Sequence, residues 1–206
     1  GMNAYQLAVS HPDFVQAIIP IAGSPATNPR TKTVLRNIMN TIALDNGWFG
    51  GRYDENPATG LATALMHLVP WWLTEEWFAA NVSTPEQRLG FEKFWNDIFS
   101  VQAPQDARDV YYQLDAWANF NLGDTPGFDG DTRAALASVK AKTLLIGAKG
   151  DLLVRLDEME LARDTIPNAR LVEIESPAGH LMVVGADTQA SEIMNREIAR
   201  FLSEIE

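Results

Sequence analysis

The chain has 206 residues, of which 46% are hydrophobic, so it can bury the core of one globular domain or of a large piece of one. Its formal net charge of −11 argues against a nucleic acid as partner, because phosphate binding requires clustered Lys and Arg. The absence of cysteine excludes a disulfide, a thiolate nucleophile and a zinc–thiolate centre, and we expect no metal ion and no bound cofactor.

The longest apolar runs are short. Val15–Gly23 and Leu68–Leu73 fall well below the roughly 20 residues that a helix needs to cross a bilayer, and no signal-peptide pattern opens the chain. We therefore expect a soluble, cytoplasmic protein without a membrane contact.

The first residues predict a helix over Met2–Ser10, with Ala4, Leu7 and Ala8 on one side. A domain rarely begins within an element, and Gly1 before Met2 reads as a cloning remnant joined to an initiator methionine. We therefore expect that an N-terminal part of the domain precedes this sequence.

Three short apolar segments predict buried strands: Val15–Gly23, Ala141–Gly147 and Ala169–Glu175. A helical segment, Leu156–Thr165, separates the second strand from the third. Strand, helix and strand at this spacing indicate a βαβ unit, so the strands should be parallel. The last segment, Ala190–Glu206, has apolar residues near helical period and should pack on the sheet.

The middle of the chain, residues 28–128, contains all six Trp residues and reads as several helices without strands. It is too long for a simple crossover. We therefore predict an α/β core made of residues 1–27 and 129–206, with residues 28–128 inserted as a helical lid. Ligands of such parallel sheets bind at the carboxyl ends of the strands, so the lid should cover that edge.

The three histidines of the chain differ in their surroundings in the sequence. His11 lies in a turn beside Pro12, which favours a capping or solvent role. His67, in a predicted helix around Leu61–Leu68, fits either an ordinary helix-face histidine or a substrate contact. His180 directly follows a predicted strand in a loop where a glycine allows a tight turn, as suits a general base.

An acid occupies the matching position after the preceding strand. Asp151 follows Ile146–Gly150, and the carboxyl ends of neighbouring parallel strands share one edge of a sheet. A carboxylate there could orient the imidazole of His180 and stabilise its charged form. Taken alone, the two residues fit equally well a turn aspartate and a loop histidine.

The order of acid and then histidine near the C-terminus is that of α/β-hydrolases, whose nucleophile comes earlier, in a Gly-x-Ser-x-Gly elbow. None of the serines in this chain has that pattern, so none is a credible nucleophile.

Several segments in this order resemble the homoserine O-acetyltransferase family. The opening residues, Gly1–Val15, look like the helix that follows the family's nucleophile. The other segments that carry the resemblance are Asp45–Tyr53, Pro57–Leu61, Asp106–Leu114, Ile146–Asp151 and Ile166–His180. The resemblance implies an α/β-hydrolase fold, catalytic roles for Asp151 and His180, and a nucleophilic serine just upstream of Gly1.

Two positions depart from the family. Where the family has an aspartate after the catalytic histidine and an arginine in the lid, this chain has Leu181 and Trp71. Apolar residues there would leave the charged ends of an amino acid desolvated and unpaired, so homoserine should be a poor substrate. A lid-packing role for Trp71 and Leu181 is the alternative, and it is compatible with the same conclusion.

The resemblance therefore implies acyl transfer on an ester or thioester, with acetyl-CoA or another acyl thioester as a possible co-substrate. Candidate substrate-binding residues are His67, Trp71 and Leu181. The alternative is a truncated, non-catalytic relative that serves as a binding or assembly module. Because the predicted strand at Val15–Ala22 would form an open sheet edge, we also expect a homodimer.

Overall fold

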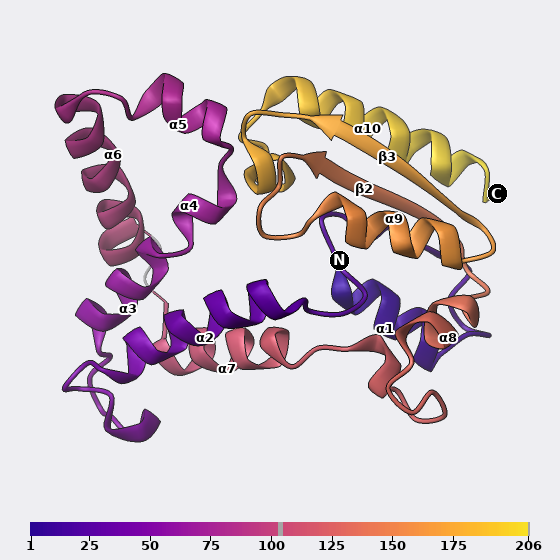
Figure 1. Ribbon diagram of the computed structural model, residues 1–206, viewed down its shortest axis with the longest axis horizontal. Helices are drawn as coiled ribbons and strands as arrows, with labels where there is room; N and C mark the ends of the chain where they lie inside the picture. Colours follow the sequence, from indigo (N-terminus) through magenta and orange to yellow (C-terminus); the bar gives the residue numbers. More distant parts are fainter. Residues whose placement is uncertain (103–104, 206) are drawn as a thin grey trace. The chain divides into compact units, whose positions relative to one another are not determined.

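A computed structural model of the protein describes residues 1–102 and 105–205 (Figure 1). The chain divides into two units, which are described separately below. Unit 1 comprises Gly1–Ala26, Trp72–Thr74 and Phe120–Glu206, and unit 2 comprises Thr27–Trp71 and Glu75–Asn119. Three residues from the middle of the predicted insertion, Trp72–Thr74, therefore belong to unit 1.

Unit 1 is built on a parallel sheet with the strand order β1-β2-β3. The strands are β1 (Ala17–Ile18), β2 (Lys142–Lys149) and β3 (Ala169–Glu175). Helix α9 (Leu156–Thr165) connects β2 to β3 with the bounds expected from the sequence. The predicted βαβ unit is therefore confirmed.

The prediction of a strand over Val15–Gly23 was too long, and Pro20 gives the physical reason. The Pro20 carbonyl accepts a hydrogen bond from the N–H of Ile146, and the N–H of Ala22 donates to the Ile146 carbonyl. The bond that comes before these two in the ladder, which an N–H at residue 20 would donate to β2, is missing because proline has no N–H. Regular pairing therefore ends at Ile18, and a single bridge follows at Ile21.

Helices cover both faces of this sheet (Figure 1). Alternate residues of β2, Leu144, Ile146 and Ala148, share a buried cluster with Phe201 of helix α10 (Thr188–Ser203). On the other face, a Cβ on Gly147 would lie 2.8 Å from the Met159 sulfur of α9, so that helix lies very close to the strand. Helix α10 begins two residues before the predicted start, because Asp187 caps its first turn.

The remaining helices of unit 1 are α1 (Met2–Ser10) and α8 (Thr132–Ala137), with short 3₁₀ turns at Leu122–Asp124 and Gly179–Val184. Helix α1 forms where it was predicted, but its buried side consists of Tyr5, Ala8 and Val9, and Leu7 is exposed. The fully buried Tyr5 hydroxyl donates to the Gly23 carbonyl. Burial raises the pKa of Tyr5 far above its ordinary value, so the phenol stays neutral.

The described residues of unit 2 form helices joined by turns and loops, without a named strand. Helices α2 (Pro29–Ala43) and α7 (Ala107–Ala118) contribute most of its core, with α3 (Ala58–Met66) against α2. The other helices are α4 (Val69–Trp72, whose last residue belongs to unit 1), α5 (Glu75–Asn81) and α6 (Pro85–Asp97), with short turns at Phe49–Gly51 and Ile98–Gln102. No helix in the described part of the chain has the length and apolar character needed to cross a membrane.

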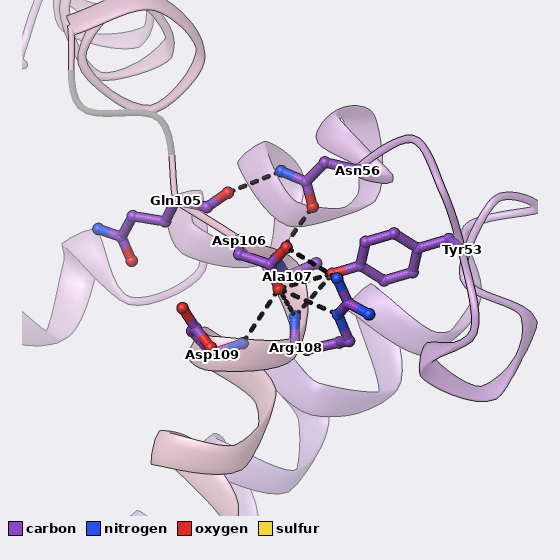
Figure 2. A network of polar contacts seen from close by, with 7 residues as sticks. All are labelled: Tyr53, Asn56, Gln105, Asp106, Ala107, Arg108 and Asp109. Carbon is purple, nitrogen blue, oxygen red and sulfur yellow. Dashed lines mark hydrogen bonds and ion pairs between the residues drawn. The ribbon is translucent and has the colours of Figure 1, made fainter.

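A polar network ties two distant segments of unit 2 together (Figure 2). The Tyr53 hydroxyl donates to Asp106 Oδ1 at 2.8 Å and accepts from the N–H of Arg108 at 2.9 Å. Asn56 bonds the backbone of Gln105 and Ala107. The Arg108 and Tyr53 side chains bond Asp106 and hold its pKa below the ordinary value. Tyr53 ends one of the segments that resemble the homoserine O-acetyltransferase family, and Asp106 begins another. Two separate motifs of the sequence therefore meet in this network.

Candidate active site

The structure brings Asp151 and His180 together at the carboxyl edge of the sheet. Asp151 lies two residues beyond the end of β2, and His180 lies in the turn that follows β3. Nδ1 of His180 is 2.8 Å from Asp151 Oδ2. The Asp151 side chain is fully buried, whereas that of His180 is 19% exposed. One carboxylate and one imidazole thus form a pair, and their catalytic role stays a prediction.

Backbone amides fix the carboxylate of Asp151. Its Oδ1 accepts from the N–H groups of Leu153 at 2.8 Å and Val154 at 2.9 Å. Because a backbone N–H can only donate, Oδ1 is the acceptor in both hydrogen bonds. These two bonds restrict the rotation of the carboxyl group. An ionised carboxylate accepts at Oδ2 as well, and this arrangement fits the tautomer of His180 that carries its proton on Nδ1 and leaves Nε2 as a base. None of the described residues forms a hydrogen bond with Nε2.

The loop that carries His180 is tied to helix α10. The buried Ser176 hydroxyl donates to Asp187 Oδ2 at 2.7 Å and accepts from the N–H of Ala178 at 3.2 Å. Asp187 Oδ1 accepts from the N–H of Ala190 and so caps the helix. The Ser176 hydroxyl, and then the Ala190 amide, hold the pKa of Asp187 below its ordinary value. An ionised cap therefore anchors the turn before the histidine.

The other candidate residues are divided between the two units. Leu181 follows His180 in the same 3₁₀ turn and is half-buried. His67 and Trp71 belong to unit 2, where they line one cavity of about 330 Å³. His67 caps the C-terminus of α3 instead of lying inside it. The guanidinium of Arg30 lies 4.6 Å from the centre of the Trp71 ring, so the surroundings of Trp71 include a cation that sequence reasoning missed.

Three supporting residues were not predicted. Ser176 and Asp187 brace the turn that carries His180, and Thr74 contacts the loops of both Asp151 and His180. Asp187 stands before a helical segment, which is a recognisable capping signal. Thr74 carries no such signal, because its position depends on the return of residues 72–74 to unit 1.

Comparison with known proteins identifies the family of the fold. Residues 1–186 match the family described as alpha/beta hydrolase fold. The chain belongs to this family. The predicted fold class is therefore confirmed, and at this level so is the resemblance seen in the sequence.

Relatives of the chain include esterases and O-acyltransferases. An ethyl acetate hydrolase of Pseudomonas veronii is 26% identical, and the match covers 98% of this chain and 58% of that protein. A homoserine O-acetyltransferase of Symbiobacterium thermophilum is 29% identical over 100% of this chain and 57% of its own length. A solved structure of the acetyl esterase MekB superposes with a TM-score of 0.86 at 25% identity and covers 98% of this chain and 59% of that one. The chain thus spans less than two thirds of the length of these relatives.

Proposed function

We propose that this chain supplies the histidine and the aspartate of a Ser–His–Asp acyl-transfer enzyme that acts on an ester or thioester. The observation that carries the proposal is the hydrogen bond between His180 Nδ1 and the buried carboxylate of Asp151. The relatives that are esterases and O-acyltransferases support the same reaction class. The chain contains no Gly-x-Ser-x-Gly elbow, so the serine is expected from a segment that this sequence does not include.

In the proposed mechanism each member of the pair has a role. Nε2 of His180 takes the proton of the serine hydroxyl while the serine oxygen bonds to the acyl carbon. The resulting imidazolium is stabilised by Asp151 and returns the proton to the leaving alkoxide or thiolate. Water or an alcohol then attacks the acyl-enzyme with the same help from His180, which releases the acid or the new ester and restores the serine.

The substrate we favour is an ester or acyl donor with an apolar portion, with acetyl-CoA or another acyl thioester as a possible donor. Leu181 follows the catalytic histidine directly, so this position offers no charge to a substrate ammonium group. Trp71 and His67 line a cavity with mainly apolar neighbours. An acceptor with an ammonium group, such as homoserine, is therefore disfavoured at Leu181, although Arg30 beside Trp71 leaves a cation near the second position.

The test begins with the DNA upstream of the Met2 codon. An in-frame stretch that encodes Gly-x-Ser-x-Gly defines a longer protein, which should hydrolyse p-nitrophenyl acetate. In that protein, His180→Ala should lower kcat by about 10⁴-fold, because the general base is lost. His11→Ala is the matched control and should leave kcat unchanged, since His11 lies at the end of α1.

Equal kcat values for the His180→Ala protein and its parent would contradict the mechanism. A stop codon directly upstream of Met2 would instead favour the alternative, a non-catalytic module for binding or assembly. Efficient acetylation of homoserine by the longer protein would contradict the proposed substrate class and leave the mechanism intact.

A further inference from the structure

Thr74 lies where the loops of Asp151 and His180 come together. It belongs to unit 1, although its sequence neighbours Trp71 and Glu75 belong to unit 2. Its side chain is buried, with 8% of the residue exposed. A buried hydroxyl at this place needs a partner, and its partner lies in the loop of His180.

The polar atoms of Thr74 hold that loop. Its hydroxyl donates to the Pro177 carbonyl at 2.9 Å, and its backbone N–H points at the same oxygen at 3.4 Å. Pro177 stands three residues before His180, between Ser176 and the turn that carries the imidazole. The loop is thus held on one side by Thr74 and on another by Asp187 through Ser176.

The methyl group of Thr74 lies close to both loops. A Cβ on Gly150 would lie 3.1 Å from Thr74 Cγ2, and a Cβ on Gly179 would lie 3.4 Å from the same atom. These two glycines immediately precede Asp151 and His180. One methyl group therefore packs against the residue before each member of the pair.

The glycines cannot be exchanged for larger residues that would fill this space themselves. Gly150 and Gly179 have φ angles of +79° and +53°, in the left-handed region that favours glycine. A Cβ on Gly179 would also lie 2.8 Å from the carbonyl oxygen of Trp72, a backbone atom. Both turns consequently depend on the segment Trp72–Thr74 for their packing.

We propose that Thr74 is a positioning residue that sets the separation of Asp151 and His180. Its hydroxyl fixes the loop of the histidine, and its methyl group spaces that loop from the loop of the aspartate. The catalytic meaning of this arrangement rests on the proposed acyl transfer. The geometric statement does not, because it concerns only the hydrogen bond between the two side chains.

The test therefore observes that hydrogen bond directly in the 206-residue chain. The proton on His180 Nδ1 gives a downfield NMR resonance, which is assigned by its loss in His180→Gln. In Thr74→Val, which keeps the shape and removes the hydroxyl, the exchange of this proton with water should be about tenfold faster because the loop opens more often. Thr74→Ser, which keeps the hydroxyl and loses the methyl group, should show a smaller increase.

Thr143 provides the matched control. It is a buried threonine of unit 1 whose hydroxyl donates to the Ala141 carbonyl at 3.1 Å, near the opposite end of β2. Thr143→Val should lower the thermal stability to a similar degree and leave the exchange of the His180 proton unchanged.

An unchanged exchange rate in Thr74→Val, or an equal increase in Thr143→Val, would overturn the proposal. If Thr74→Val does not fold, the comparison of Thr74→Ser with Thr143→Ser decides: faster exchange in the first alone supports the proposal, and equal rates refute it. The exchange rate of the His180 proton is measured without a substrate, so it does not depend on whether the protein has esterase activity. The positioning role of Thr74 and the proposed function are therefore tested separately.

Discussion

At Asp151 every oxygen of the carboxylate has a defined partner. Two backbone amides occupy Oδ1, and the imidazole of His180 occupies Oδ2. This arrangement is rigid because the carboxylate is buried and cannot exchange these partners for water. It also selects one tautomer of the histidine, the one with the proton on Nδ1 and the free base on Nε2.

Asp151→Asn tests that selection. The asparagine oxygen would keep the two amide bonds, so its NH₂ group would face Nδ1 and turn that nitrogen into an acceptor. We expect the ¹⁵N NMR shifts of His180 to report the proton on Nε2 instead of Nδ1, with thermal stability close to that of the parent. An unchanged tautomer would contradict the role of Asp151. In a longer protein with the serine, the same change should lower kcat by about 10⁴-fold.

Some residues of the candidate site can be predicted from the sequence, and others cannot. Asp151 and His180 could be predicted because each follows an apolar, strand-like run with a glycine before it, and parallel strands end at one edge. Thr74 could not be predicted, because its contacts arise only from the placement of residues 72–74 in the sheet-based unit 1. Supporting contacts of this kind depend on tertiary structure and leave no local pattern.

Among the elements, those with strong end signals were predicted best. Helix α9 has its expected bounds because Ile166 and Pro167 stop it, and a turn precedes it. Strand β1 was overestimated because apolar β-branched residues surround Pro20, whose missing N–H faces β2. The hydrophobic pattern overestimates the burial of this segment as well as its pairing, because Val15, Ala17, Ile19 and Ile21 are only half-buried.

Helix α10 provides a prediction for the pH dependence of stability. The pKa of Asp187 in the folded chain lies below its ordinary value, mainly through the Ser176 hydroxyl. Because the pKa of this carboxyl group is lower in the folded chain than in the unfolded chain, its ionised form stabilises the fold at pH values above the unfolded pKa of about 3.9. This stabilisation is lost as the pH falls through the pKa of the folded chain. Asp187→Asn keeps the cap and removes the charge.

We therefore expect the free energy of unfolding of Asp187→Asn to differ most from that of the parent near neutral pH. The difference should shrink as the pH falls below about 4, as measured by urea unfolding across that range. Ser176→Ala, which removes the main cause of the lowered pKa, should reduce the pH-dependent part. A difference that does not change with pH would show that the ionised carboxylate contributes nothing through this bond.

For the whole molecule, the sequence predicts a sheet-based part and a helical part, since its strand-like runs lie at Val15–Gly23, Ala141–Gly147 and Ala169–Glu175, outside residues 28–128. The return of Trp72–Thr74 to unit 1 was not foreseen. The composition of a segment of three residues does not indicate which unit the segment belongs to. Only the three-dimensional structure shows this. This segment contains the residue to which we assign the positioning role.

The sheet of unit 1 also bears on assembly. Hydrogen bonds from β1 to β2 involve the even-numbered residues, since the carbonyls of Gln16 and Pro20 accept from β2 and the N–H of Ala22 donates to it. The N–H and carbonyl groups of the odd-numbered residues Ala17, Ile19 and Ile21 therefore point to the outer edge. That edge has no partner strand among the described residues, although a Cβ on Gly1 would lie 2.8 Å from the Ile21 carbonyl oxygen, so the start of α1 lies against the edge there. Pro20 does not protect it, because its missing donor faces inward.

We propose that a second copy of the chain pairs with this edge to form a homodimer, since open apolar edges recruit further strands. Light scattering at low micromolar concentration should give the mass of a dimer. Amide hydrogen exchange locates the contact: the N–H groups of Ala17, Ile19 and Ile21 should become protected as the concentration rises. The N–H of Ala22, which bonds to the Ile146 carbonyl within the chain, is the internal control and should stay protected at every concentration. A monomeric mass, or a dimer in which the three outward amides exchange freely, would refute pairing through β1.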